Sequence, residues 1–337
     1  MYYQTKMSHL LSTKLSRSQY TVAIAGATGN LGSEICRIFL TEYRPFFSRV
    51  LGLVRNTSSP TALSLAAEGA ELHQFGTSND NAPLVKLLEG VDVVVNILPT
   101  TVTTELKNAL FDAALKGGAK VYFPSEFGVD HRLNDFPGFD HSDWTHKRTH
   151  VAEIRQAAED KLKVVAVYVG LFLEDSIGPW FGFDTASNSY TCVGEPTQRI
   201  TFTAKSDIGR SLAELALIAL SPVSSARVRD DLRIAGSVAS FADVRDIAER
   251  VRAELDVGAK GIELKTEDLA SFRERTRGHY LADPTISPAD HLRILMAEGK
   301  LDYSGDNANE IVNPAQSIWK WKTVEDYIRE VKGKPWC

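Results

Sequence analysis

Residues 20–32 read YTVAIAGATGNLG, and this stretch decides the predicted fold. An apolar run meets three glycines, Gly26, Gly29 and Gly32, and an apolar helical pattern continues to residue 40. A strand, a tight turn and a helix in this order present the N–H groups of a helix N-terminus to a dinucleotide pyrophosphate. The spacing is G-x-x-G-x-x-G rather than the usual G-x-G-x-x-G, so a merely glycine-rich turn is the alternative.

Each glycine of this turn has its own predicted role. Gly26 permits the tight turn, Gly29 allows the phosphate to approach bare backbone, and Gly32 lets the helix lie against the strand. The sequence therefore predicts a dinucleotide site here, with cofactor contacts from Gly26, Thr28, Gly29, Asn30, Leu31 and Gly32.

The composition is that of an ordinary soluble enzyme. Of the 337 residues, 43% are hydrophobic and 24% are charged, and the net charge of −5 argues against a nucleic-acid partner. The sequence has no run of about 18 apolar residues, so it predicts no membrane span. Three widely separated cysteines, Cys36, Cys192 and Cys337, indicate a reducing, cytoplasmic location without disulfides or a metal site.

Strand-like and helical patterns alternate through the first half of the chain. Continuous apolar strands such as VDVVVNIL, at residues 91–98, are typical of a parallel sheet that is covered on both faces. Right-handed crossovers then give an α/β fold with a doubly wound parallel Rossmann sheet. Further strands are expected at residues 50–54, 71–75, 121–124 and 164–169, and helices at 60–68, 83–88, 103–116 and 146–158.

The alternation fades after residue 170, where a smaller, interleaved C-terminal substrate-binding lobe is expected. A helix is predicted at 206–220, a strand at 232–235, and helices at 241–255, 266–275, 288–298 and 324–331. Ser206 and Asp207 are the candidate caps of the first of these helices, and Asp207 is interpreted as a cap rather than a catalytic acid.

The patterns also predict the domain organisation. Residues 1–19 carry basic side chains and no acidic one, so a flexible extension is predicted, with a transit peptide as the alternative. Residues 20–170 form the NAD(P)-binding Rossmann domain, and residues 171–337 form mainly the substrate-binding lobe. Within that lobe, residues 204–236 are expected to return to the Rossmann sheet.

The residue that ends the second strand indicates which dinucleotide binds. An acidic side chain there accepts hydrogen bonds from a free ribose 2′-hydroxyl, whereas a basic one pairs with a 2′-phosphate. The strand VLGLV ends at Arg55, whose guanidinium suits a phosphate, and Asn56, Ser58 and Ser59 offer neutral donors. The sequence predicts NADP(H) rather than NAD(H), and the alternative is an arginine that is only solvated.

Several segments are similar to one known family. They are GATGNLG at 26–32, VR at 54–55, PSEFGVD at 124–130, SDIGR at 206–210 and, more loosely, VGLFLE at 169–174. Over residues 20–330 the chain resembles the atypical short-chain dehydrogenases of the isoflavone-reductase-like and NmrA-like group. The resemblance implies NADPH-dependent reduction of a small phenolic or enone-like compound.

The resemblance also implies a catalytic lysine on the helix that follows PSEFG. The candidate is Lys147, whereas the spacing of plant members, counted back from Arg155, gives Val151, one helical turn later. Pro124, Phe127 and Lys147 complete the predicted cofactor contacts. A solvated helix lysine is the alternative for Lys147.

The chemistry independently needs such a group. Hydride arriving at a carbonyl or conjugated carbon leaves negative charge on oxygen, which a positioned proton donor or cation must stabilise. Classical short-chain enzymes use Tyr-x-x-x-Lys, but the only match is Tyr2 with Lys6, ahead of the first strand. The residue four positions before Lys147 is Asp143, so the classical mechanism is excluded.

Other polar residues are candidates for supporting roles. Ser125 and Glu126 either contact the nicotinamide or substrate or brace their loop, and Asn96 is a candidate to face the cofactor. A histidine group lies between PSEFG and the following helix, and at most one member is expected to touch the substrate. Its members are His131, His141, His146 and His150.

Aromatic residues in the loops at the carboxyl edge of the sheet could line a pocket for a flat ligand. Two or three of Phe127, Phe172, Trp180, Phe181, Phe183 and Tyr190 are expected to do so. The predicted substrate contacts are Phe127, Phe172, Trp180 and Phe181.

Two functions of different classes follow from these observations. The first is an NADPH-dependent reductase that transfers hydride to a small, aromatic or conjugated carbonyl substrate. The alternative is an NmrA-like redox sensor that binds NAD(P) without turnover and acts through protein partners. The partners expected for the first are a small molecule, no nucleic acid and no membrane, and the sequence indicates no particular oligomeric state.

Overall fold

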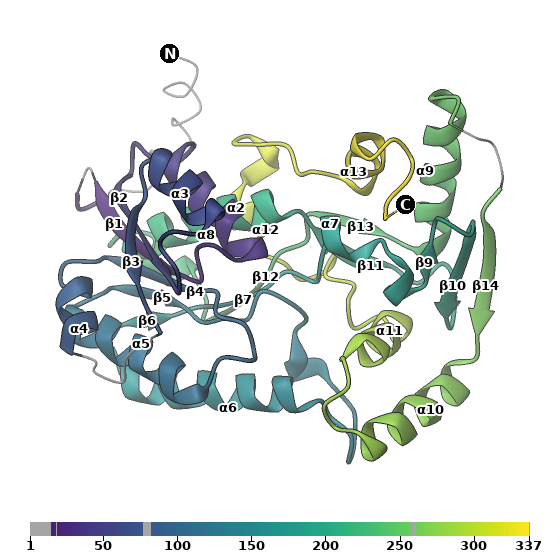
Figure 1. Ribbon diagram of the computed structural model, residues 1–337, viewed down its shortest axis with the longest axis horizontal. Helices are drawn as coiled ribbons and strands as arrows, with labels where there is room; N and C mark the ends of the chain where they lie inside the picture. Colours follow the sequence, from purple (N-terminus) through teal and green to yellow (C-terminus); the bar gives the residue numbers. More distant parts are fainter. Residues whose placement is uncertain (1–14, 18, 77–81, 258–260, 337) are drawn as a thin grey trace.

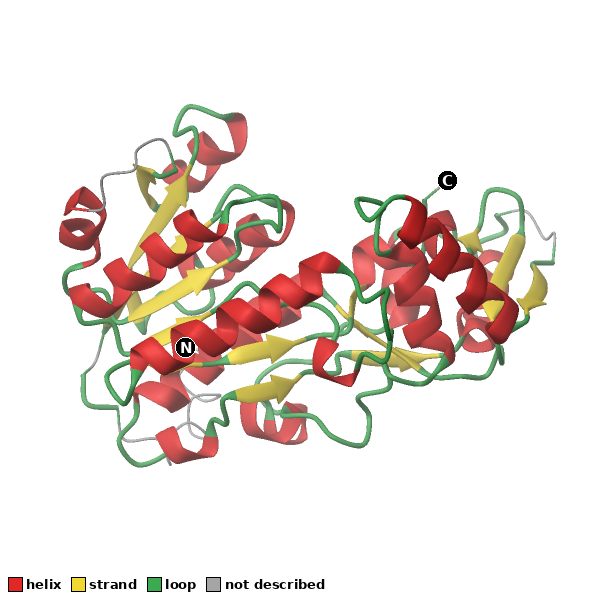
Figure 2. Cartoon of the chain, turned by 90° about the horizontal axis from the view of Figure 1, so that it is seen from below, coloured by secondary structure: helices red, strands yellow, loops and turns green. Residues whose placement is uncertain are grey.

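Two lobes lie side by side in the protein (Figure 1, Figure 2). The structure is a computed structural model that describes residues 15–17, 19–76, 82–257 and 261–336. One lobe contains a six-stranded sheet, and the other contains two three-stranded sheets with several helices. Tyr2, Lys6 and Cys337, together with most of the expected N-terminal extension, lie outside the described residues.

The six-stranded sheet has the order β3-β2-β1-β4-β5-β6, and its paired strands are all parallel. The chain moves outward from β1 to β3 and then crosses back to β4, which creates a topological switch between β1 and β4. The predicted doubly wound α/β class is confirmed. The strands are β1 (Tyr20–Ala25), β2 (Phe47–Val54), β3 (Glu71–Gln74), β4 (Val93–Asn96), β5 (Val121–Phe123) and β6 (Lys163–Val164).

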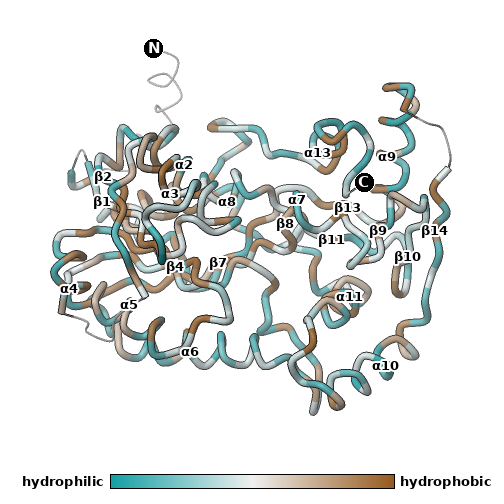
Figure 3. The backbone as a smooth tube through the Cα atoms, in the orientation of Figure 1, coloured by the Kyte–Doolittle hydropathy of each residue, from teal (hydrophilic) through white to brown (hydrophobic). Residues whose placement is uncertain are grey.

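Helices cover both faces of this sheet (Figure 1). On one face lie α2 (Asn30–Leu40), α3 (Pro60–Ala67) and α8 (Lys205–Leu220). On the other face lie α4 (Ala82–Leu88), α5 (Thr104–Gly117) and α6 (Ser142–Ala158). Because both faces are covered, every residue of β1 and β4 is buried, and hydrophobic colour gathers at these strands in Figure 3.

The second lobe begins where the sheet ends. Strand β7 (Ala166–Tyr168) continues from β6 and pairs with β12 (Asp231–Arg233). One small sheet joins β8 (Leu171–Phe172), β11 (Ile200–Thr203) and β13 (Ser237–Ala239), and the other joins β9 (Phe183–Asp184), β10 (Ser189–Val193) and β14 (Glu263–Glu267). The helices are α7 (Leu173–Ser176), α9 (Phe241–Glu254), α10 (Leu269–Ala282), α11 (Ala289–Ala297), α12 (Asn309–Val312) and α13 (Val324–Glu330). Short 3₁₀ turns are η2 (His131–Leu133), η3 (Pro179–Phe181), η4 (Ser225–Arg227) and η5 (Pro314–Gln316).

The lobes share chain segments rather than meeting as separate units. Helix α8 packs against α2, although the two helices lie more than 160 residues apart in the sequence. Near the N-terminus, Arg17 forms a 2.7 Å ion pair with Asp92, and the other oxygen of Asp92 accepts the Thr21 N–H. The interleaved character of the fold follows from α8 and β12, whereas the boundaries drawn at residues 170, 204 and 236 stay a prediction.

Three predicted elements have different bounds in the structure. The helix predicted for residues 266–275 is wrong at its start, because residues 263–267 form β14 and Asp268 caps α10 by accepting the Ser271 N–H. The strand predicted for 164–169 divides at Val165, since β6 pairs with β5 and β7 pairs with β12. Helix α6 begins four residues earlier than predicted, with His141 as its N-cap.

The prediction that Asp207 caps a helix is wrong. The N-cap of α8 is Ala204, and Asp207 lies inside the first helical turn with no exposed surface. Its carboxylate accepts a hydrogen bond from Arg210 and another from the Lys322 N–H, at 2.8 Å each. Asp207 therefore links α8 to the C-terminal segment.

Two cysteines of the described residues are buried as free thiols. They are Cys36 and Cys192, and burial raises the pKa of Cys36 to about 12. Within the described ranges no helix is both long and apolar enough to cross a membrane.

A buried carboxyl group lies between α2 and α8. Glu214 is 1% exposed, and its Oε1 accepts a 2.7 Å hydrogen bond from the Tyr43 hydroxyl. Its Oε2 has no hydrogen-bond partner among the described residues. Burial raises the pKa of Glu214 to about 7, because the charged form loses its solvation.

This pKa predicts a pH-dependent effect of Glu214→Gln on stability. Because the folded-state pKa lies above the ordinary value of 4.5, the folded protein binds more protons than the unfolded chain between these values, and its stability falls as pH rises through them. Glutamine removes the cost of ionisation, so the variant should gain roughly 2–4 kcal/mol relative to the parent between about pH 4 and about pH 8. Urea unfolding at both pH values measures the difference.

The exposed Glu89 is the matched control, and Glu89→Gln should show no comparable change between the two pH values. An equal effect of Glu214→Gln at both pH values would contradict a raised pKa for Glu214.

Candidate functional site

The glycine turn after β1 requires glycine at two positions. Gly26 has a φ of +86°, and a Cβ at this position would lie 2.8 Å from the Ile97 carbonyl oxygen. A Cβ at Gly32 would lie only 2.1 Å from the Gly26 carbonyl oxygen. The backbone of α2 therefore touches the backbone of the turn, which agrees with the roles predicted for Gly26 and Gly32.

The N-terminus of α2 is open beside this turn. Gly29 is the exposed N-cap, and a Cβ there would meet only the Gly26 oxygen, at 3.2 Å. The first helical hydrogen bond runs from the Ser33 N–H to the Gly29 oxygen. The amides of residues 30–32 therefore precede the helical ladder, where they and the helix dipole favour an anion. Of the other predicted contacts, Thr28 is half-buried and Leu31 is buried.

Asn30 joins the glycine turn to the second lobe. Its Nδ2 donates a 2.5 Å hydrogen bond to Asp175 of α7, and its Oδ1 accepts one of 2.8 Å from the Lys205 ammonium. Lys205 also forms a 3.0 Å ion pair with Asp175. Neither Asp175 nor Lys205 belongs to a predicted motif, although each directly adjoins one, VGLFLE for Asp175 and SDIGR for Lys205.

Arg55 directly follows β2 and is exposed. Its carbonyl oxygen accepts a 3.2 Å hydrogen bond from Gln74, while its guanidinium forms no ion pair with the described residues. Ser59 caps α3, so one of the predicted neutral donors has a structural role. Arg55 thus lies at the end of the second strand, where Rossmann folds bind the adenosine ribose of the dinucleotide.

The PSEFG loop follows β5 at the same edge of the sheet. The Ser125 hydroxyl donates a 2.8 Å hydrogen bond to the Leu98 carbonyl, which braces the loop. The Glu126 carboxylate lies 2.6 Å from His131 Nε2, and both side chains are 2% exposed. The Asn96 side chain is hydrogen-bonded within the protein. It donates to the Tyr122 hydroxyl and accepts from the Leu98 N–H.

Lys147 lies beside this loop. Its ammonium donates a 3.1 Å hydrogen bond to the Glu126 carbonyl. Val151, the other position considered for a lysine, is a buried apolar residue. The half-buried Lys147 therefore offers the proton donor nearest to PSEFG on α6.

An aromatic pocket of about 290 Å³ lies on one side of Lys147. Three of the six aromatic residues considered line it, namely Phe127, Phe172 and Phe181. Pro288 and Leu292 of the second lobe also line the pocket, and so does Trp144 of α6. The complete lining is Glu126, Phe127, Gly128, Val129, His131, Trp144, Lys147, Gly170, Leu171, Phe172, Asp175, Ser176, Phe181, Pro288 and Leu292.

The remaining aromatic candidates lie elsewhere. Trp180 is outside the aromatic pocket, donates a 3.1 Å hydrogen bond to the Asp175 carbonyl, and packs edge-on against Trp336. Phe183 and Tyr190 are fully buried in the core of the second lobe, where the Phe183 ring stacks on Phe241 at 4.0 Å.

A second hollow, the threonine chamber, is also lined by Lys147 and holds about 230 Å³. Glu126 and Lys147 line both hollows. The complete lining of the chamber is Asn96, Leu98, Thr100, Thr101, Val102, Thr103, Thr104, Lys107, Ser125, Glu126, Asp143, His146, Lys147 and His150.

The structure separates the four histidines of the predicted group. His131 lines the aromatic pocket, and His146 and His150 line the threonine chamber. His141 instead caps α6 through its Nδ1 and contacts the Ile286 carbonyl through its Nε2 at 2.9 Å.

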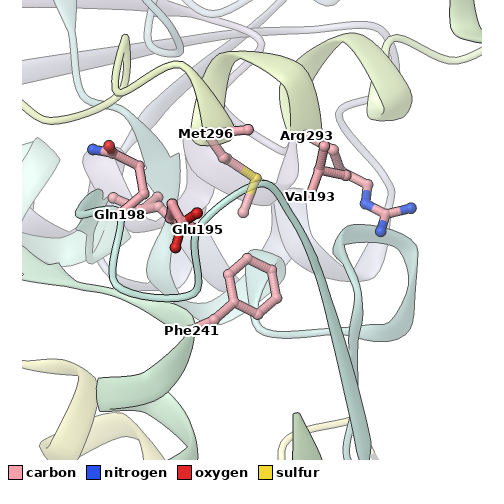
Figure 4. Close-up of a pocket in the computed structure, with 8 residues that line it drawn as sticks. Val193, Glu195, Gln198, Phe241, Arg293 and Met296 are labelled. Atoms are coloured by element: carbon pink, nitrogen blue, oxygen red, sulfur yellow. The ribbon is translucent and has the colours of Figure 1, made fainter. Parts of the chain in front are cut away.

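Two further hollows offer little to a ligand. The one in Figure 4, between Val193, Phe241 and Met296, holds about 10 Å³, which is about the space of one water molecule. The other is a charged surface hollow whose arginines, Arg132 and Arg233 among them, pair with neighbouring aspartates. Within the described ranges no group of three histidine, cysteine or acidic residues is placed to hold a metal ion.

The fold and the open helix N-terminus define the class of Rossmann-fold proteins. The chain belongs to the NmrA-like family, whose model matches residues 18–254. It is 28% identical over 198 residues to the oxidoreductase aprR of Aspergillus flavus, covering 58% of this chain and 64% of that protein. It is 29% identical over 153 residues to a probable pinoresinol-lariciresinol reductase 3 of Arabidopsis thaliana, covering 45% and 47%. The chain thus spans less than two thirds of the length of these curated relatives.

Solved structures of two reductases have the same fold. An isoflavone reductase superposes with a TM-score of 0.70 at 18% identity, covering 94% of this chain and 100% of that chain. The binary complex of leucoanthocyanidin reductase with NADPH from Vitis vinifera superposes with a TM-score of 0.71 at 19% identity, covering 93% and 99%. At these identities the likeness concerns the fold.

The two glycines of the turn should respond differently to alanine. Gly32→Ala places a Cβ 2.1 Å from a backbone oxygen and should destabilise the protein by about 1–3 kcal/mol, because α2 must move away from the turn. Gly29→Ala meets one oxygen at 3.2 Å on an exposed surface and should cost less than about 1 kcal/mol. Urea unfolding of both variants tests this, and equal losses would show that the close approach at Gly32 is not required.

Proposed function

We propose that the protein is an NADPH-dependent reductase that transfers hydride to a small aromatic or conjugated carbonyl compound. The observation that carries this proposal is the position of the Lys147 ammonium. It lies in the wall of the aromatic pocket, at the sheet edge where the glycine turn also opens. A proton donor beside an apolar pocket is what reduction of a carbonyl or conjugated system requires.

The residues at the sheet edge fit a dinucleotide phosphate. The helix N-terminus at residues 30–32 would hold the pyrophosphate through its backbone amides. Gly29, the N-cap, has no side chain to block the phosphate from reaching them. The Arg55 guanidinium, which forms no ion pair within the described ranges, would hold a 2′-phosphate. When bound, NADPH supplies the hydride. The proposed contacts are Gly26, Thr28, Gly29, Asn30, Leu31, Gly32, Arg55, Pro124, Phe127 and Lys147.

The aromatic pocket suits a flat substrate. Phe127, Phe172 and Phe181 offer ring faces, and about 290 Å³ is a size typical of a small-molecule site. These three residues are the proposed substrate contacts, joined by Trp144. Trp180 is not among them, because it lies outside the pocket.

Lys147 is the proposed proton donor. Its bond to the Glu126 carbonyl fixes the ammonium at the pocket wall, and two other donor positions on Nζ remain for a substrate oxygen. The proton passes from Nζ to the oxygen on which negative charge develops. The ammonium thus takes the part that a tyrosine hydroxyl has in classical short-chain enzymes.

The relatives support a reductase. The similar proteins named above are an oxidoreductase, a probable pinoresinol-lariciresinol reductase and solved reductases, one of them in complex with NADPH. We also propose residues 20–170 as the cofactor domain and residues 171–337 as mainly the substrate lobe, with residues 204–236 belonging to the Rossmann sheet. A cytoplasmic location is supported by the two buried free thiols, Cys36 and Cys192.

The choice of cofactor predicts the effect of Arg55→Ala. Charge-assisted hydrogen bonds to a phosphate contribute about 1.5–3 kcal/mol each, so the variant should bind NADPH at least about tenfold more weakly. NADH lacks the 2′-phosphate, so its affinity should hardly change. Calorimetric titration of both cofactors into both proteins is the measurement, and equal losses would refute the assignment of Arg55.

Turnover tests the function and Lys147 together. NADPH oxidation is followed with a panel of phenolic enones, aldehydes and quinones, and at least one should be reduced. With the fastest acceptor, Lys147→Ala should lower kcat by roughly 10²–10⁴, the usual contribution of a positioned acid–base group. Lys147→Arg should not restore it, because a guanidinium does not release its proton near neutral pH.

Calorimetric binding of NADPH to each variant is the control for loss of the cofactor site. Full turnover by Lys147→Ala would return Lys147 to a solvated helix lysine. Tight NADPH binding by the parent without oxidation by any acceptor would favour the alternative function, a redox sensor without turnover.

A further inference from the structure

The threonine chamber is suited to hold water. Its volume of about 230 Å³ has room for several water molecules, each of which occupies about 30 Å³ in the liquid. Four threonine residues line it, Thr100, Thr101, Thr103 and Thr104. These residues and His146 are exposed, so the chamber has a polar rim on the solvent side.

Two titratable side chains of the chamber have no role in the aromatic pocket. His150 is 7% exposed, and neither of its ring nitrogens has a hydrogen-bond partner among the described residues. Lys107 reaches the chamber from α5, is half-buried, and forms no salt bridge with the part of the chain that the structure describes. Buried polar groups normally have partners, so both call for water or for a function.

We propose that Lys107 and His150, with water in the threonine chamber, return a proton to Lys147 after each turnover. This inference rests on the proposed function, in which the Lys147 ammonium protonates the substrate oxygen. Lys147 is one of the two residues that line both hollows, so its side chain borders the proposed substrate pocket and the chamber.

The protons balance in this sequence. The Lys147 ammonium gives one proton to the product oxygen and becomes a neutral amine. A chamber water then gives a proton to Nζ and regains one from the Lys107 ammonium or from protonated His150. Solvent at the rim reprotonates these groups, so one proton enters for each that leaves. No group is oxidised or reduced in these steps.

The two side chains are suited to this role by their chemistry. His150 can accept a proton at one ring nitrogen and release one at the other, because neither nitrogen is bonded to a residue that the structure describes. Burial lowers the pKa of Lys107, and the charge of Lys147 lowers it further, while Asp143 and Glu126 oppose the change. Lys107 therefore gives up its proton more readily than an exposed lysine.

The charges around His150 act in both directions. Burial lowers its pKa, and the Lys107 charge adds to this effect. Glu126 and Glu153 favour the protonated form. On α6, Asp143 and His146 also line the chamber.

The kinetic test uses Lys107→Met and His150→Gln, which remove the titrating group and keep much of the volume. Each should lower kcat by about tenfold, less than loss of Lys147 itself, because water in the chamber still carries some protons. The loss should be larger in steady state than in the first turnover, in which Lys147 is already protonated. Heavy water should slow the variants more than the parent.

Lys116→Met is the matched control, because Lys116 is an exposed lysine at the other end of α5. The acceptor is the one that NADPH reduces fastest in the panel described above. Parent-like kcat in both relay variants, in ordinary and in heavy water, would overturn the inference.

A second readout needs no substrate. Competitive acetylation over a range of pH, followed by mass spectrometry of the full-length protein with and without NADPH, compares the reactivity of individual lysines. Lys107 should react at lower pH than Lys116, and Lys147→Met should move its reaction to higher pH. Identical profiles for Lys107 in the parent and in Lys147→Met would show that the two ammonium groups do not interact, and would also overturn the inference.

The outcomes separate this inference from the function on which it rests. If Lys147→Ala is inactive while both relay variants are fully active, the proton return fails and the reductase stands. If Lys147→Ala is fully active, the role of Lys147 fails and the proton return fails with it.

Discussion

The hydrogen bond from the Lys147 ammonium to the Glu126 carbonyl joins α6 to the loop after β5, and these two residues line both hollows of the site. The position of this lysine depends on packing between the lobes. His141 caps α6 and also contacts the Ile286 carbonyl, so the start of the helix is held by a segment of the second lobe. Trp144, one turn before Lys147, packs edge-on against His291 of α11. The second lobe therefore fixes the register of the helix that carries the proposed proton donor.

The parts of the fold that the sequence predicts well are those with local physical requirements. A positive φ at Gly26 and a backbone contact at Gly32 need glycine whatever surrounds them, so the turn is visible in thirteen residues. Strands buried on both faces must be continuously apolar, which makes β1 and β4 readable without knowledge of their neighbours. The candidate position of Arg55 follows from the length of the same strand–turn–helix–strand unit. For these reasons the Rossmann sheet and its glycine turn are predictable from the sequence, whereas the phosphate contacts stay a prediction.

The second lobe depends on contacts that no local pattern contains. Strands β8 and β9 have two residues each, and β14 has the polar sequence ELKTE, so β14 is a strand only because it pairs with β10. Asp207 has the chemistry of a cap, yet the helix begins earlier, at Ala204, and tertiary bonds to Arg210 and Lys322 use its carboxylate. The aromatic pocket is closed by Pro288 and Leu292, which lie far along the chain from PSEFG. Propensity and motif could not supply these neighbours.

The different linings of the two hollows have a physical consequence for a charge that borders both. Hydrophobic and aromatic side chains of the aromatic pocket keep the local dielectric low, which strengthens the interaction of an ammonium with a developing oxyanion. Threonine and histidine side chains of the threonine chamber are polar, and a water held there, as proposed, would carry a proton. A lysine surrounded only by the apolar lining would lose its charge too easily, and one surrounded only by water would act weakly on the substrate. Lys147 lines both hollows, and its bond to the Glu126 carbonyl holds the side chain there.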